Sequence, residues 1–246
     1  MGTIIAISAE AGTAQRALAG IEAAFAAIAQ VERLMHPTRA GSDLFAIRQA
    51  TLGRPLAIHA WTWDVLALSR RLSRTSNGAF DPCLPGAAGR FADLEFAAPQ
   101  FVIPHAPLHI DLGGIAKGYA VDRALMALRA AGCHGAVVNA GGDLAVFGNR
   151  NHPIVIRNRG VNGRLELKNA ALATSDVCSA ARPAEHRGYY HGLTCREIRT
   201  GHVSVSAASA AIADGLTKCL LADHGKTNTA LLESFDARLV AYEFHP

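Results

Sequence analysis

The segment from residue 109 to residue 148 constrains the fold most, because it sets several elements in a fixed order. It predicts a strand that ends at "HID", a tight turn at Gly113-Gly114 and a helix over residues 115–131. Gly132 suits the end of that helix, where a left-handed backbone is common. The buried strand "GAVVNA", a second glycine turn "GGD" and the strand "LAVFG" follow. The segment therefore predicts a helix beside a strand pair.

The rest of the chain combines long helices with runs of strands. We expect a first strand over 3–8, then a helix over 13–35 that buries an apolar stripe of Leu18, Ile21, Phe25, Ile28 and Met35. We also expect loops over 36–44 and 79–89, helices over 60–76 and 209–223, mostly strands over 153–207, and a last strand over 237–244. This grouping favours an α+β fold over a regular β-α-β alternation.

Composition narrows the function classes. Half of the residues are hydrophobic, so a sizeable core can form. The net charge is +4, and no Lys/Arg run is interleaved with aromatics, which argues against nucleic acid as a partner. The five cysteines show no CxxC spacing and indicate reduced, partly buried thiols.

The location of the protein is predicted from what the sequence does not show. No apolar run is long enough to cross a bilayer. The start "MGTIIAISAE" shows no signal peptide, so we expect a cytoplasmic location, or a periplasmic one if a leader has been trimmed.

The stretch "DLGGIAKGYAVD" places a cation at the positive end of a helix dipole. Lys117 falls in the first helical turn, where a cation is disfavoured by a few tenths of a kcal/mol or more, so a negative group is expected nearby. Gly113, Gly114 and the free N–H groups of the helix suit an anion such as phosphate. Asp111 suits a hydroxyl, a ring N–H or a metal. The alternative is a tight turn with a solvated Asp111–Lys117 pair.

The segment "ADGLTKCLLA" predicts a second polar cluster on a helix. Asp214 and Lys218 are four residues apart, so the simplest interpretation is a surface ion pair worth ~0.3–0.5 kcal/mol. The functional alternative is that Asp214 supplies an oxygen ligand to Mg²⁺. Gly215 costs ~1 kcal/mol inside a helix and indicates a close approach to the backbone. No HExxH or GxSxG motif supports a zinc site or a hydrolase triad.

Taken together, these motifs resemble those of the ApbE family, the FAD:protein FMN transferases. The resemblance rests on an ordered set that spans most of the chain: "MGT" at the start, "GAFDP" at 78–82, "IDLGGIAKGYAVDRA" at 110–124, "VNAGGDLAVFG" at 138–148, "ATS" at 173–175, "RTG" at 199–201, and "VSVSA" and "ADGLTK" within 203–218. It implies one ApbE-like domain over 1–246, with mixed or antiparallel sheets, flanking helices and two interlocked subdomains.

The resemblance also implies an activity and its cofactors. The chain would bind FAD and, with Mg²⁺, join FMN through a phosphoester to a Ser or Thr of an acceptor flavoprotein. The negative partner of Lys117 would then be the pyrophosphate of FAD. Asp111, Gly113 and Lys117 match family contacts to FAD, and Met1 matches a methionine beside the flavin.

Three further positions match the metal site of the family, and no residue is assigned to catalysis. Gly114 and Thr217 would each offer a backbone carbonyl to Mg²⁺, and Asp214 would offer its carboxylate. This match predicts that Asp214 lies near the carbonyl of Gly114.

The chain also departs from the family pattern, which keeps other functions open. Lys218 replaces a threonine, so either its ammonium takes the place of the metal, or it turns outward and Asp214 and Thr217 keep Mg²⁺. The common HxxDPxTG stretch appears only as "HGLTCREIRTG". Two alternatives follow: a non-catalytic FAD-binding protein that has lost the metal, and an FAD pyrophosphatase that uses water as the acceptor.

Overall fold

The computed structural model describes residues 2–84, 88–157, 162–177, 201–222 and 229–244. Within these ranges a six-stranded sheet forms the centre of the molecule, and every neighbouring strand pair is antiparallel. Its strands, in spatial order, are β1 (Ile5–Glu10), β5 (Gly135–Ala140), β6 (Asp143–Phe147), β9 (Ala171–Val177), β10 (Gly201–Ala207) and β11 (Arg238–Phe244). Antiparallel sheets with separate helices confirm the predicted α+β class.

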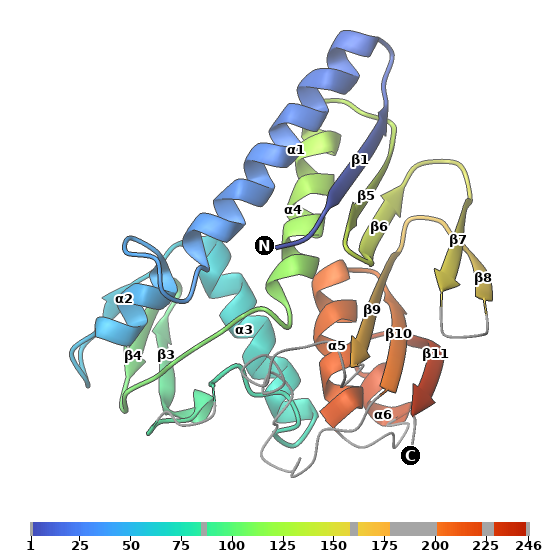
Figure 1. The fold of residues 1–246 in the computed structure, drawn as a ribbon. Helices are drawn as coiled ribbons and strands as arrows, with labels where there is room; N and C mark the ends of the chain where they lie inside the picture. Colours follow the sequence, from blue (N-terminus) through green and yellow to red (C-terminus); the bar gives the residue numbers. More distant parts are fainter. Residues whose placement is uncertain (1, 85–87, 158–161, 178–200, 223–228, 245–246) are drawn as a thin grey trace.

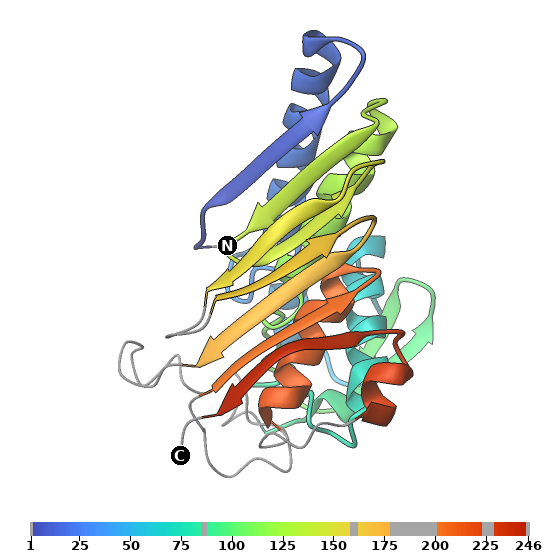
Figure 2. The same cartoon turned by 90° about the vertical axis from the view of Figure 1, so that its right-hand side faces the viewer.

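Three helices cover one face of this sheet: α1 (Ala14–Leu34), α4 (Ala116–Ala130) and α5 (Ala210–Ala222). Figure 2 looks onto the sheet, and these helices lie behind it. Toward the other face, β7 (His152–Arg157) and β8 (Asn162–Leu167) form a hairpin. Ile156 and Leu167 of this hairpin pack with Leu144 of β6 and Leu172 of β9. The sheet is therefore buried on both sides near its middle.

A smaller unit lies beside α3 (Ala60–Thr75), at the lower left of Figure 1. A three-stranded sheet in the order β2 (Leu56–Ala57), β4 (Phe101–Pro104), β3 (Leu94–Ala98) forms this unit. The short elements α2 (Asp43–Gln49), the 3-10 helix Phe91–Asp93 and α6 (Thr229–Glu233) complete the described chain. None of its helices is both long and apolar enough to span a membrane.

The structure corrects two sequence predictions. Only part of the stripe predicted for α1 is buried: Ile28 and Met35 are buried, whereas Leu18 and Phe25 are 58% and 44% exposed. The buried residues of α1 are Gly20, Ala24, Ile28, Val31 and Leu34, and a Cβ on Gly20 would lie 2.7 Å from Sγ of Cys133. The predicted strand ending at "HID" is also absent from the described residues, where Ile110 makes only an isolated bridge to Cys83.

The elements around the glycine turns are confirmed. The predicted helix 115–131 is α4, and Gly132 follows it with φ +83°. The turn "GGD" joins β5 to β6, and Gly141 and Gly142 have φ values of +66° and +100°. The predicted helix 209–223 corresponds to α5, of which residue 223 lies outside the described residues.

Candidate anion-binding pocket

The turn before α4 is shaped by Asp111. Its Oδ1 accepts a hydrogen bond from the backbone N–H of Gly113 at 2.6 Å, and its own N–H donates to the carbonyl of Pro82 at 2.9 Å. The helix then starts after Ile115, which provides no side-chain cap. In the first turn of α4, the N–H of Ala116 donates to the carbonyl of Leu112 at 2.7 Å, and the N–H of Gly118 donates to Oδ2 of Asp214 at 3.2 Å. The positive end of the helix is therefore partly compensated within the protein.

Lys117, in this first turn, has two carboxylates beside it. Its Nζ lies 2.8 Å from Oδ2 of Asp143 and 3.4 Å from Oδ2 of Asp214. Burial opposes the charge on Lys117, but Asp214 and then Asp143 outweigh it and raise the pKa of the ammonium. The expected negative neighbours of Lys117 are therefore present within the protein itself.

Asp214 is completely buried and joins α5 to α4. Its Oδ2 accepts the backbone N–H of Gly118 at 3.2 Å, and its Oδ1 accepts from Nζ of Lys218 at 2.5 Å. Burial alone would raise the pKa of Asp214, but the charges of Lys218 and Lys117 hold it below the usual range. The sequence-based interpretation of Asp214 and Lys218 as a surface pair is wrong, because only 7% of Lys218 is exposed.

Lys218 sits in a closed set of oxygen atoms. Besides Asp214, its Nζ donates to Oγ of Ser175 at 2.5 Å and to Oγ1 of Thr217 at 3.0 Å. Oγ1 of Thr217 donates to the backbone carbonyl of Asp214 at 2.7 Å and lies 2.7 Å from Oγ of Ser175. Lys218 thus points inward, toward the residues predicted to hold a metal.

Asp143 follows the glycine turn of the β5–β6 hairpin, and only 1% of its surface is exposed. Its Oδ2 has no hydrogen-bond partner, so its contact with Lys117 is an ion pair without hydrogen-bond geometry. Burial, and next the charge of Asp214, raise the pKa of Asp143 to about 6, while Lys117 and Lys218 oppose this shift. The ionised form of Asp143 is thus less stabilised than that of Asp214.

The two helices that carry this cluster are held together at close range. A Cβ on Gly118 would lie 2.2 Å from the carbonyl oxygen of Ala210, so only glycine allows α4 and α5 to approach this closely. The close approach predicted at Gly215 is also present, since a Cβ there would lie 2.4 Å from Leu72 of α3. Both glycines fix the position of Asp214 relative to α4.

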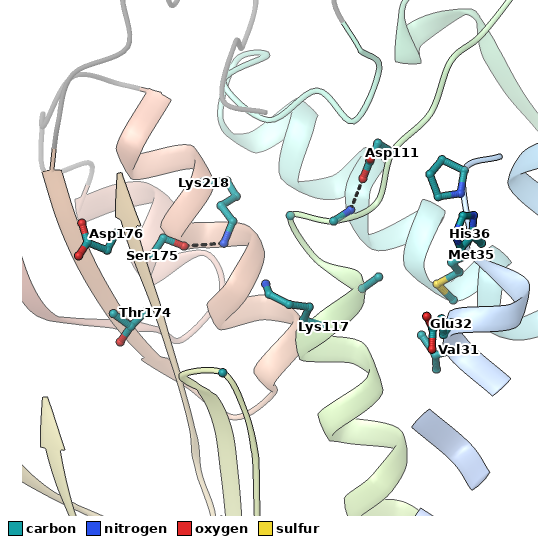
Figure 3. Close-up of a pocket in the computed structure, with 15 residues that line it drawn as sticks. Val31, Glu32, Met35, His36, Asp111, Lys117, Thr174, Ser175, Asp176 and Lys218 are labelled. Carbon is teal, nitrogen blue, oxygen red and sulfur yellow. Dashed lines mark hydrogen bonds between the residues drawn. The ribbon is translucent and has the colours of Figure 1, made fainter. Parts of the chain in front are cut away.

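A pocket of about 470 Å³ opens beside this cluster. Figure 3 shows Lys117 of α4 and Lys218 of α5 reaching toward the same region of the pocket, which β9 bounds on one side and the end of α1 on the other. Its lining comes from five parts of the chain: Val31, Glu32, Met35, His36, Pro37, Asp111, Gly113, Gly114, Ala116, Lys117, Gly141, Thr174, Ser175, Asp176 and Lys218.

The structure brings most of the predicted site residues together. Asp111, Gly113, Gly114 and Lys117 line the pocket. Asp214 and Thr217 lie buried behind Lys218. Met1 lies outside the described residues, and the predicted proximity of Asp214 to the carbonyl of Gly114 stays a prediction.

Sequence reasoning missed two residues of the cluster, Asp143 and Ser175. Both lie in motifs that were noted for other reasons, "GGDLAVFG" and "ATS". The isolated hairpin signal gave no reason to assign chemistry to Asp143. Ser175 meets Lys218 only through the pairing of β9 with β10 and the packing of α5, which no local pattern shows.

The side chains around Asp214 do not fit a divalent metal. Within the part of the chain that the structure describes, no group of three or more His, Cys, Asp and Glu side chains could hold a metal ion. The oxygen atoms of Asp214, Ser175 and Thr217 surround the ammonium of Lys218 instead. Mg²⁺ needs six oxygen ligands at ~2.1 Å, so it would have to displace this ammonium.

A family model described as the ApbE family matches residues 1–100 and 87–242 of the chain. No curated protein sequence matches it. The flavinyl transferase ApbE of Pseudomonas stutzeri has a similar fold, with a TM-score of 0.77, 20% identity, and 98% of this chain and 94% of that chain covered.

Two other solved structures are similar to the same extent. The flavin transferase ApbE of Vibrio cholerae gives a TM-score of 0.78 at 20% identity, with 100% of this chain and 94% of that chain covered. The ApbE protein of Thermotoga maritima gives a TM-score of 0.74 at 20% identity, with 99% and 94% covered.

Proposed function

The chain belongs to the ApbE family, and from this premise we propose that it is a flavin transferase that moves FMN from FAD to a Ser or Thr of an acceptor flavoprotein. Two of its structural relatives are named flavin or flavinyl transferases, which supports the proposal. The acceptor has to present an exposed hydroxyl side chain at the mouth of the pocket.

The observation that carries the proposal is the start of α4, with Lys117, in the wall of the pocket. Ile115 gives the helix no side-chain cap, and Lys117 adds a cation to the same end. A helix N-terminus with an adjacent ammonium is a site for a phosphate group. The pyrophosphate of FAD supplies two linked phosphates to such a site.

The rest of the pocket suits the remainder of a dinucleotide. Val31 and Met35 give an apolar wall for a planar ring, on the side opposite β9 in Figure 3, and Pro37 also lines the pocket. Glu32 and Asp176 also line the pocket, where carboxylates accept hydrogen bonds from ribityl and ribose hydroxyls or from a ring N–H. The volume of about 470 Å³ lies within the range of cofactor sites, about 300–1,000 Å³.

The proposed reaction balances with FAD, the acceptor and water, which takes up the proton. The acceptor hydroxyl oxygen bonds to the phosphorus of FMN, and the phosphoanhydride bond to AMP breaks. AMP leaves with the electron pair of that bond, and the hydroxyl proton passes to water. Lys117 and the positive end of the α4 dipole hold the phosphate oxygens and stabilise the charge that moves onto AMP.

The test is to incubate the protein with FAD and a flavoprotein acceptor, and to follow the acceptor mass and the release of AMP. The proposal predicts an added FMN on the acceptor and an equal amount of AMP. Release of AMP and FMN without the acceptor would instead show a pyrophosphatase. The variant Lys117→Met should lose the transfer, and Lys168→Met, an exposed lysine outside the pocket, should keep it.

A non-catalytic FAD-binding protein is the second candidate, because Lys218 fills the oxygen set in which the resemblance predicts a metal. It predicts that FAD binds and is recovered intact after long incubation with the acceptor. Neither FMN on the acceptor nor AMP in solution would then form.

A further inference from the structure

We infer that the ammonium of Lys218 is a built-in cation that replaces a divalent metal in this pocket, so that the chain binds the pyrophosphate of FAD without Mg²⁺. The inference rests on the proposed binding of FAD and adds to it the nature of the positive charge that faces the pyrophosphate. Three observations on α5, β9 and the turn before α4 support it.

The first observation is that the hydrogen bonds around Lys218 form one consistent set. The hydroxyl of Thr217 donates to the carbonyl of Asp214, so its Oγ1 is free to accept from Ser175 and from Lys218. Ser175 then donates its only hydroxyl proton to Thr217 and accepts from Lys218. An ammonium has three N–H donors, and Asp214, Ser175 and Thr217 take all three.

A metal ion would break this set at several points. It would take the oxygen atoms that the ammonium now contacts at 2.5–3.0 Å, and Lys218 would lose its partners while its side chain is only 9% exposed. A buried ammonium next to a divalent cation is strongly repelled, because the low-dielectric surroundings screen the two charges weakly.

The second observation is the charge balance of the cluster. Two ammonium groups, Lys117 and Lys218, lie among two carboxylates, Asp143 and Asp214. The four charges sum to zero while both carboxylates are ionised, so the protein already neutralises Asp214 without help from an ion. A divalent metal added to this balance would leave two uncompensated positive charges in a buried cluster.

The third observation is that the glycine turn is shaped to Lys218. A Cβ on Gly114 would lie 3.1 Å from Cγ and 3.8 Å from Cε of Lys218, so the absence of a side chain at Gly114 makes room for the lysine stem. Lys218 itself lines the pocket with Gly114 and Lys117. Its charge is therefore placed at the pocket end to which α4 already attracts phosphate.

The direct test is a titration of the protein with Mn²⁺, used as a spectroscopic probe for Mg²⁺ sites and followed by electron paramagnetic resonance. We expect wild type and Lys218→Arg to show no tight Mn²⁺ site. Lys218→Thr should bind Mn²⁺ at least about tenfold more tightly than wild type, because it frees the oxygen atoms of Asp214 and Ser175. Tight Mn²⁺ binding by wild type, unchanged in Lys218→Thr, would overturn the inference. Thermal unfolding of each variant shows whether it is folded.

FAD titrations separate this inference from the proposed function. Wild type should bind FAD equally well in EDTA and in Mg²⁺, within about twofold. Lys218→Met should bind FAD at least about tenfold more weakly, with riboflavin affinity unchanged, and Mg²⁺ should not restore it.

FAD binding or FMN transfer that requires Mg²⁺ would refute the built-in cation and keep the transferase. Metal-independent FAD binding without transfer would refute the transferase and keep the built-in cation. If FAD does not bind at all, the Mn²⁺ titration still decides whether Lys218 excludes the metal.

Discussion

The starts of α4 and α5 lie side by side, but only the start of α4 lines the pocket. At α5, the carboxylate of Asp122 accepts the backbone N–H groups of Ala210 and Ala211 at 2.8 and 2.9 Å and the hydroxyl of Ser209 at 2.7 Å. At α4, Ile115 provides no side-chain cap, and the turn lines the pocket. Each helix start therefore donates backbone N–H groups to a carboxylate of the other helix, but the start of α4 also lines the pocket with Lys117.

The two helices also anchor each other reciprocally. Asp122 of α4 caps α5, and Asp214 of α5 accepts the N–H of Gly118 in α4. Burial raises the pKa of Asp122, and the N–H and hydroxyl donors around it oppose that rise. The comparison predicts that changes at the contacts between the two helices act on stability, whereas a change at Lys117, which lines the pocket, acts on ligand binding.

The largest expected effect is that of Gly118→Ala. The added Cβ would meet the carbonyl of Ala210 at 2.2 Å, and backbone cannot move aside as a side chain can. We expect a loss of at least ~3 kcal/mol in the free energy of unfolding, measured with urea. Gly114→Ala is the matched control, since its nearest neighbour is the flexible stem of Lys218 at 3.1 Å, and it should cost less than ~1 kcal/mol. Equal losses in the two variants would show that the contact between the helices is not close.

Asp122→Ala should have the next largest effect, because it leaves the buried N–H groups of Ala210 and Ala211 without an acceptor. We expect the free energy of unfolding to fall by ~2 kcal/mol. Glu22→Ala, at an exposed position of α1, should change it by less than ~0.5 kcal/mol. Urea unfolding measures both, and a loss no greater than that of the control would contradict the capping role.

The sequence predicts some elements of the fold better than others. The glycine turns, α4, α5 and most strands follow from periodicity and from Gly or Asn at the ends of elements. The buried side of α1 follows only in part: Ile28 is buried as predicted, but Gly20 and Ala24 are also buried and carry little hydrophobic signal. The short elements α2, β2 and α6 are too brief to show a period.

The sequence predicted many of the residues of the candidate site, but not the contacts that these residues make with one another. Local patterns identified Lys117 and Asp214 as separate candidates, but not that one carboxylate joins Lys117 to Lys218. Whether a polar side chain four residues from another faces solvent or the interior depends on tertiary packing. Asp143 was missed for the same reason, since its turn alone predicts only a hairpin.

At the start of α4, Lys117→Met should weaken FAD binding by about tenfold or more, because it removes a cation that lines the pocket. Riboflavin, which lacks phosphate, should bind with unchanged affinity. Titrations followed by flavin fluorescence measure both ligands. If both affinities fell equally, Lys117 would not contact phosphate.

The smallest expected effect is a pH dependence that comes from Asp143. Its pKa is raised to about 6, so the carboxylate is charged above this pH and competes with phosphate for Lys117. Below about pH 6 it becomes neutral and the cluster gains one positive charge, while the pyrophosphate diester of FAD keeps its charge. FAD affinity should therefore rise about threefold from pH 7.5 to pH 5.5.

The variant Asp143→Asn separates the contribution of Asp143 to this pH dependence from that of residues that line the pocket, such as His36. The variant should bind FAD with the higher affinity at both pH values and show a flatter profile. A profile identical to that of wild type would assign the pH dependence to another group.

Calorimetric titration of wild-type protein with FAD, FMN and riboflavin, all in EDTA, tests most directly that the start of α4 and its lysine neighbours form a metal-independent pyrophosphate site. The account predicts that FAD binds most tightly, riboflavin most weakly and FMN between them, with FAD at least about tenfold tighter than riboflavin. Equal affinities for the three flavins, or FAD binding that appears only after Mg²⁺ is added, would contradict it.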